Sequence, residues 1–261
     1  MHGAQKIVQR GQLIITIMAV TGMIVEKAFV ALEKPTIIEG SPSIGLVGAI
    51  ATEYLATQLG MVEIGFLQST KLPPVTIIKD GIPKSPIRLY AKDNLVVIVS
   101  DSAVPPELTY DIADRIVEWG VAHDAKQVIS LGGIAHQIEK KKKEPGVFAI
   151  ASNEAILKEL TDSGIPTIKL GFLSGTFGIL MLKCQEKNIK SYGFLADADP
   201  NIPDPLAAAA VLDVLKKQLN IELDTAPLRS ASDKIRARVD LLVEQTKSQD
   251  DSEKAYPSLY R

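Results

Sequence analysis

The sequence predicts an α/β fold in which a mostly parallel sheet is flanked by helices. Short apolar runs alternate with longer segments of helical periodicity from residue 36 onward, and the connections between them are short. This alternation is typical of parallel strands joined by helices that cover both faces of a sheet. The continuous apolar run Leu95–Val99 is typical of a central strand in such a sheet.

The elements are predicted from apolar periodicity and from the residues that separate the periodic segments. The strands are expected at 36–39, 61–67, 75–79, 86–90, 95–99, 128–131, 147–151, about 166 onward and 192–196. The helices are expected at about 46–59 and 107–120, in segments that end near 164 and near 187, and at 204–219. Asp80-Gly81 is predicted to form the turn of an antiparallel hairpin between 75–79 and 86–90.

Helix ends carry specific signals. Gly60 is placed to cap the carboxyl end of the helix at 46–59. Asp204 and Pro205 mark the start of the helix at 204–219, because aspartate is a favoured N-cap residue and proline fits the first helical turn. The apolar face of the helix at 46–59 consists of Val47, Ile50, Tyr54 and Leu55.

Composition excludes several classes of protein. The 261 residues are 46% hydrophobic and 23% charged, which is typical of a folded protein. The net charge of −2 argues against a dedicated nucleic-acid binder, because such proteins usually carry a strong basic excess. Cys184 is the single cysteine, so no internal disulfide or multi-cysteine zinc site is expected. We therefore expect a cytoplasmic protein without a nucleic-acid or membrane partner.

Four segments are expected: an N-terminal extension at 1–30, an α/β domain at 31–227, an amphipathic helix at 228–248 and a flexible docking tail at 249–261. Residues 13–25 are uncharged and follow Lys6 and Arg10, which resembles the layout of a signal sequence. Two other interpretations are favoured. Either Met23 is the native start, or the segment forms an extra strand rich in β-branched residues.

Glycine-containing turns after predicted strands are candidate ligand loops. Gly40, Pro42 and Gly45 lie between a strand and a helix, where a phosphate could approach the N–H groups of the helix start. Pro42 stands where a dinucleotide-binding fingerprint needs glycine, and the lysine of a P-loop is missing. A tight turn with close helix packing is therefore favoured. Two further candidates, Gly132-Gly133 and Ser174, also follow strands and could form a cleft at the strand ends.

No catalytic constellation is predicted. Ser174 lies one residue too late for a nucleophile elbow in the segment from Gly171 to Gly175. His123 and His136 lack local metal-ligand spacing and cysteine partners. The segment 197–201 begins like a calcium loop but lacks its glycine and its terminal glutamate. The sequence thus predicts neither an enzyme nor a metal or cofactor site.

The last three residues, Leu259-Tyr260-Arg261, follow the polar stretch 245–258. Ordering a flexible arm costs conformational entropy. An exposed apolar side chain on such an arm offsets this cost only when it is buried in a pocket of a partner. This hydrophobic–Tyr–any ending resembles the docking tails of proteasome activators and chaperones.

The body of the chain, over about residues 33–226, resembles the archaeal proteasome assembly chaperone family, some members of which were once labelled ATP-grasp-like. The resemblance rests on 35–48, Glu53-Tyr54-Leu55, 131–134, 171–182, 187–189, 203–207 and 219–224. Ser41, Ser43 and the segment 175–178 depart from the family pattern, which leaves the subfamily open. The resemblance implies a nucleoside-phosphorylase-like domain, homo-oligomeric assembly and no established enzymatic activity.

The resemblance also implies that the tail binds the α-subunits of the proteasome core particle. Leu259 would fill an apolar part of the pocket, Tyr260 would pack its ring and hydrogen-bond, and the carboxylate of Arg261 would pair with a lysine. The expected function is a non-enzymatic chaperone or regulator. The alternatives are an enzyme that binds a nucleoside or phosphate ligand through the glycine-containing loops and, more weakly, an ATP-dependent ligase.

Overall fold

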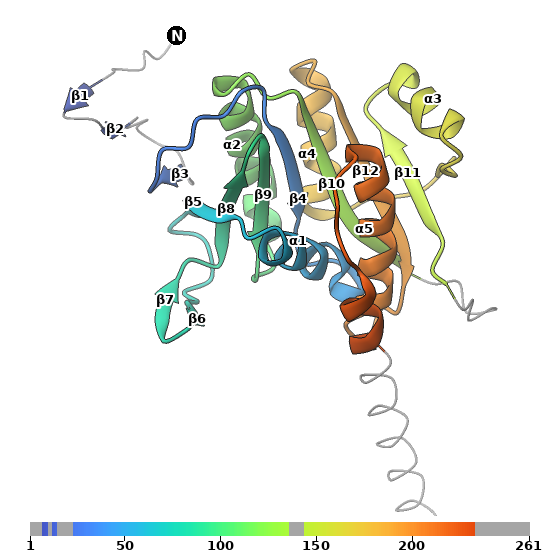
Figure 1. The fold of residues 1–261 in the computed structure, drawn as a ribbon. Coiled ribbons are helices and arrows are strands. Elements are labelled where there is room, and N and C mark those ends of the chain that lie inside the picture. Colours follow the sequence, from blue (N-terminus) through green and yellow to red (C-terminus); the bar gives the residue numbers. More distant parts are fainter. Residues whose placement is uncertain (1–6, 10–11, 15–22, 136–143, 233–261) are drawn as a thin grey trace, which may run out of the picture.

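The computed structural model describes residues 7–9, 12–14, 23–135 and 144–232. Eight strands form the main sheet, in the order β11-β12-β10-β4-β9-β8-β5-β3 (Figure 1). They are β3 (Met23–Glu26), β4 (Thr36–Gly40), β5 (Val62–Gln68), β8 (Ile87–Lys92), β9 (Leu95–Ser100), β10 (Gln127–Ala135), β11 (Val147–Ala151) and β12 (Ser191–Ala198). Two short hairpins lie outside this sheet: β1 (Ile7–Gln9) with β2 (Gln12–Ile14), and β6 (Ile77–Lys79) with β7 (Ile82–Lys84).

The α/β class predicted from the sequence is confirmed. The four central strands β12, β10, β4 and β9 are parallel, while β11 on one side and β8, β5 and β3 on the other are antiparallel to their neighbours. Successive residues of each central strand point to opposite faces. Ile37, Val96 and Val128 therefore join one apolar cluster, and their neighbours in sequence join the other.

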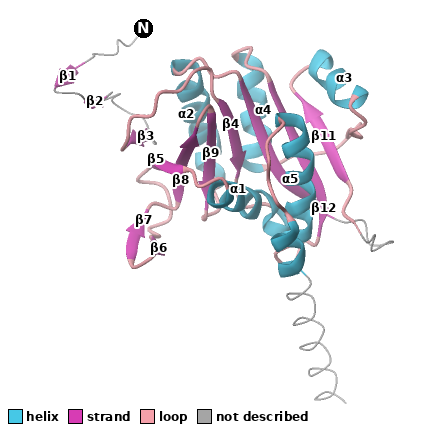
Figure 2. Ribbon diagram, in the orientation of Figure 1, coloured by secondary structure: helices cyan, strands magenta, loops and turns pink. Residues whose placement is uncertain are grey.

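Helices cover both faces of the sheet (Figure 2). Helices α1 (Val47–Gln58) and α5 (Pro205–Leu219) pack together on one face, and α2 (Thr109–Ala122) and α4 (Gly175–Glu186) pack together on the other. Helix α3 (Glu154–Asp162) packs beside β11, and the 3-10 turns η1 (Ile44–Leu46) and η2 (Pro106–Leu108) precede α1 and α2. The predicted N-cap of α5 is confirmed, because Asp204 Oδ1 accepts a hydrogen bond from the Ala207 amide at 3.1 Å.

The predicted hairpin is wrong in its second strand. The turn at Asp80-Gly81 joins β6 to Ile82–Lys84, whereas Ile87–Lys92 belongs to the main sheet between β5 and β9. The alternate residues Ile87, Leu89 and Ala91 are buried in the α2-side cluster, so this segment gains apolar burial only within the main sheet.

Arg88 also fixes β8 in place, and the sequence analysis missed it. Its side chain is 1% exposed and points to the α1 face. Its Nη1 lies 2.6 Å from Asp101 Oδ2, its Nη2 lies 3.5 Å from Glu53 Oε2, and its Nε donates to the Tyr90 hydroxyl at 2.9 Å. A buried guanidinium needs such partners, because an unpaired buried charge is costly.

Other predictions are modified. The strand expected from about 166 is reduced to one bridge between Thr167 and Ala149, since Pro166 has no N–H to donate to a ladder. Strand β3 lies at the edge of the sheet next to β5, at the end of the apolar segment 13–25. Residues 226–232 are helical, and the rest of the expected helix at 228–248 and the tail at 249–261 lie outside the described residues. Within the described part of the chain, no helix has the length and apolarity needed to cross a membrane.

The start of α1 lies in direct backbone contact with the sheet. A Cβ on Gly48 would lie 2.4 Å from the Leu131 carbonyl oxygen, and one on Gly40 would lie 2.3 Å from the Gly48 carbonyl oxygen. A Cβ on Gly133 would lie 2.2 Å from the Ile44 carbonyl oxygen. No side chain fits at these three positions without moving the backbone, so glycine here permits the helix to approach β4 and β10.

Gly48→Ala is expected to lower the free energy of unfolding by about 2 kcal/mol or more, because the added methyl group meets backbone atoms. Gly120→Ala in α2 is the matched control. Its Cβ would lie 3.1 Å from the flexible end of Ile37, and alanine favours the helix. Urea denaturation measures both variants, and equal effects would contradict the close-approach argument.

Candidate functional site

The predicted ligand loops at the carboxyl ends of the strands contact one another. The turn that contains Gly40, Pro42 and Gly45 lies against Gly132-Gly133, where the Gly133 amide is 3.4 Å from the Ser43 hydroxyl. Gly45 has a φ of +62°, and its carbonyl accepts a hydrogen bond from the Asp204 amide at 2.8 Å. Packing and hydrogen bonding therefore account for the glycines of this turn, and a ligand-binding role for them stays a prediction.

The remaining predicted loop residue, Ser174, lies apart from this contact. It is exposed and precedes α4, and its side chain makes no capping hydrogen bond. Phe177, three residues later, covers the sheet, since Cβ atoms on Gly132 and Gly193 would lie 3.5 Å and 2.2 Å from its ring. The bulk of Phe177 therefore occupies the space above the end of β10.

A buried carboxyl group lies beneath these loops. Glu39, on β4, is 1% exposed, and its Oε1 accepts hydrogen bonds from the amide of Ser41 at 2.7 Å and from the Ser41 hydroxyl. Within the described part of the chain, Glu39 Oε2, Ser130 Oγ and Thr176 Oγ1 make no hydrogen bond of normal geometry, although the Ser130 hydroxyl lies near enough to the Glu39 carboxyl to oppose the rise of its pKa. Glu39 and Ser130 are direct neighbours in the β4–β10 register.

Thr176 is the second residue of α4, which packs against β10 and β12. Glu39 and Ser130 form a pair of neighbouring buried polar residues on β4 and β10.

Burial raises the pKa of Glu39, while the hydrogen bonds from Ser41 and the hydroxyl of Ser130 oppose the shift. The raised pKa means that folding favours the protonated form of Glu39 relative to the unfolded chain. The contribution of Glu39 to the free energy of unfolding should be highest below the unfolded pKa of about 4.3. It should fall as the pH rises from there through the folded pKa, by at most about 1.4 kcal/mol per pH unit.

Glu39→Gln is expected to remove the decrease in the free energy of unfolding that Glu39 causes as the pH rises, because the amide does not titrate. Urea denaturation from about pH 4 to about pH 8 measures the free energy of unfolding. The exposed Glu222→Gln variant is the control and should keep the pH dependence of the unaltered protein. The same pH profile in Glu39→Gln would contradict the assignment.

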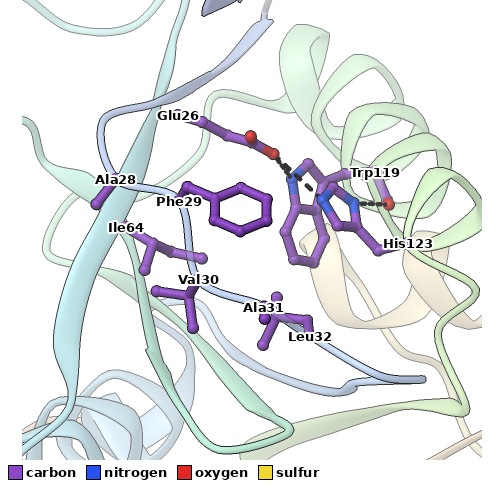
Figure 3. Close-up of a pocket in the computed structure, with 9 residues that line it drawn as sticks. All are labelled: Glu26, Ala28, Phe29, Val30, Ala31, Leu32, Ile64, Trp119 and His123. Atoms are coloured by element: carbon purple, nitrogen blue, oxygen red, sulfur yellow. Dashed lines mark hydrogen bonds and ion pairs between the residues drawn. The ribbon is translucent and has the colours of Figure 1, made fainter. Parts of the chain in front are cut away.

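A pocket of about 270 Å³ lies between β3, the segment that follows it and α2 (Figure 3). It is lined by Glu26, Ala28, Phe29, Val30, Ala31, Leu32, Ile64, Trp119 and His123. In Figure 3 the Phe29 ring points toward the indole of Trp119, with Glu26 above them and Val30 and Leu32 below. We call this the tryptophan pocket.

Hydrogen bonds fix the polar side of the tryptophan pocket. Glu26 Oε1 accepts a hydrogen bond from Trp119 Nε1 at 2.7 Å and lies 3.4 Å from His123 Nε2. The His123 ring stacks on the indole with centroids 4.0 Å apart, and its Nδ1 lies 2.9 Å from the Trp119 carbonyl oxygen. The sequence places Trp119 in the helix expected at 107–120 and gives His123 no metal-ligand spacing, but it does not connect the two residues. Their spacing of four residues, which puts both on one helical face, was the available signal.

A second pocket, of about 530 Å³, lies near the start of β12. Its lining includes Asn153, Glu159, Gln185, Asn188 and Lys190. Asn153 caps α3 through the Ile156 amide, and Lys190 Nζ lies 2.6 Å from Glu159 Oε2. These two contacts give Asn153, Glu159 and Lys190 structural roles. For the described part of the chain, no cluster of three His, Cys, Asp or Glu residues is placed to hold a metal ion.

The fold defines an α/β protein with a parallel central sheet, and comparison with known proteins gives the family. The sequence profile described as PAC2 family matches residues 37–243. The chain belongs to the PAC2 family.

Solved structures and relatives agree with this assignment. The chain is 33% identical to Pyrococcus furiosus PbaA, described as an archaeal homolog of proteasome-assembly chaperone, with a TM-score of 0.80 over 92% of this chain and 100% of that one. It is 32% identical over 234 residues to the Methanocaldococcus jannaschii protein MJ0106, covering 89% of this chain and 96% of the relative. P. furiosus PbaB, described as an archaeal proteasome activator, is 22% identical with a TM-score of 0.76 over 85% and 99% of the two chains. That likeness shows the fold alone.

Proposed function

We propose that this protein is a non-enzymatic, homo-oligomeric chaperone or regulator of the proteasome core particle. The observation that carries the proposal is the 33% identity to PbaA over the whole of that chain, whose description names a homolog of proteasome-assembly chaperone. Membership of the PAC2 family supports it. A cytoplasmic location follows from this role and, like the nucleoside-phosphorylase-like arrangement, stays a prediction.

The proposed contact is made by Leu259, Tyr260 and the carboxylate of Arg261 with α-subunits of the core particle. The sequence supports this contact, because an aliphatic residue and a tyrosine, Leu259 and Tyr260, follow a polar stretch. A contact of three residues is weak by itself. Several tails on one oligomer would strengthen it, since each further tail binds at a high effective concentration.

Exposed apolar side chains support self-association. Leu170 and Phe172 are almost completely exposed in the segment between the Thr167 bridge and α4, and Leu173 is partly exposed beside them. Contiguous exposed apolar residues often mark a protein–protein contact. A second copy of the chain is the proposed partner of this segment.

Removing residues 259–261 is expected to abolish binding to proteasome α-subunits, and Tyr260→Ala should weaken it at least about ten-fold, because the buried ring and its hydrogen bond are lost. Arg261→Ala is the matched control, since it keeps the terminal carboxylate and should bind like the unaltered protein. Pull-down of purified α-subunits measures binding, and size-exclusion chromatography verifies that the oligomer persists. Undiminished binding by the truncated protein would refute the tail contact.

The alternative function is an enzyme that binds a nucleoside or a phosphate ligand at the strand ends. The buried polar groups of Glu39 and Ser130, which are neighbours on β4 and β10, favour it. A ligand that binds the folded protein raises its melting temperature by mass action. Thermal-shift measurements with nucleosides, nucleotides and inorganic phosphate therefore test this alternative, and the absence of any shift would count against it.

A further inference from the structure

We propose that the tryptophan pocket binds an arginine side chain of a partner polypeptide. The proposal is independent of the tail contact, because none of the residues that line the pocket belongs to the tail. It rests on the charge of the pocket, on its two aromatic side chains, on its size and on its place at the edge of the sheet.

The charge of the pocket favours a cation. Glu26 is its single acidic residue, and within the described residues its lining contains no lysine or arginine. The adjacent Lys27 is directed elsewhere, with its Nζ 2.7 Å from Glu63 Oε1. The Glu26 side chain is 49% exposed, and it contacts both Trp119 and His123 through Oε1. Glu26 therefore offers a partly accessible carboxylate to a cation that enters the pocket.

The aromatic side chains favour a guanidinium. The indole of Trp119 is 8% exposed and is held by Glu26 on one side and by the stacked His123 ring on the other. Phe29 is 94% exposed in the segment between β3 and β4. A planar guanidinium stacks on aromatic faces, and such contacts are attractive. An arginine in the pocket would also cover part of Phe29.

Size and position favour a side chain of a polypeptide. A volume of about 270 Å³ is slightly below the range of roughly 300–1,000 Å³ that is usual for small-molecule and cofactor sites. The apolar residues Val30, Leu32 and Ile64 suit the methylene stem of arginine. Glu26 is the last residue of β3, which is the terminal strand of the sheet in the described part of the chain. An extended segment can add beside such a strand and place a side chain near its end.

Trp119 supplies the experiment, because it is the single tryptophan of the chain. Its fluorescence in the full-length protein is followed while Nα-acetyl-arginine amide is added, with Nα-acetyl-citrulline amide as the neutral probe of the same length. We expect a saturable change in emission with the arginine amide and a much smaller one with the citrulline amide. An equal response to the two probes, or no saturable response to the arginine amide, would overturn the proposal.

Three variants assign the response to the pocket. Glu26→Gln keeps an acceptor for Trp119 Nε1 but removes the charge, so the Kd for the arginine amide should rise at least about ten-fold. Phe29→Ala should raise it about two- to five-fold. Glu33→Gln, an exposed residue of the same segment that does not line the pocket, should leave it unchanged. An unchanged Kd in Glu26→Gln, with thermal unfolding like that of the unaltered protein, would also overturn the proposal.

Discussion

The contact between the start of α1 and the ends of β4 and β10 is the constraint on which the central architecture depends. Gly40, Gly48 and Gly133 allow backbone to meet backbone there. Because α1 lies so close to the sheet, its residues Ala51 and Leu55 are completely buried between the sheet and α5. The turn between β4 and α1 must then lie across β10. Within this turn, the Gly45 carbonyl accepts a hydrogen bond from the amide of Asp204, the N-cap residue of α5. One close approach thus connects α1, two central strands and α5.

This arrangement also limits the kind of chemistry available at the strand ends. In many α/β proteins the carboxyl ends of the strands form a ligand crevice. Here the turn at 40–46 and the ring of Phe177 lie over that region, and a buried glutamate lies beneath it. The tryptophan pocket is instead built from β3, the segment after it and α2. The contacts proposed above therefore use an edge strand and surface segments rather than a crevice at the strand ends.

Local signals predicted much of the fold. The alternating apolar runs gave most strands and helices, and Asp204 with Pro205 marked the start of α5, because a cap depends only on residues of the first turn. The wrong predictions arose where contacts between residues distant in sequence override the local pattern of apolar residues and turns. Residues 86–90 continue the predicted hairpin locally, but they pair with β9 because burial in the main sheet stabilises them more. Among the candidate sites, the glycine-containing turns were predicted from their position after strands. Close backbone contacts account for the presence of glycine at these positions without a ligand. The binding role of the tail residues Leu259, Tyr260 and Arg261 remains a prediction.

The sequence by itself determined the α/β class, the glycine positions, and the polar composition of 245–258 before Leu259-Tyr260-Arg261, since each is a property of neighbouring residues. Tertiary structure alone decided which strands are neighbours and which distant side chains meet. Glu26 and Trp119 are 93 residues apart in the chain, yet a 2.7 Å hydrogen bond joins them. The physical reason is that β3 lies at the edge of the sheet beside α2, and no periodicity within either segment encodes that placement.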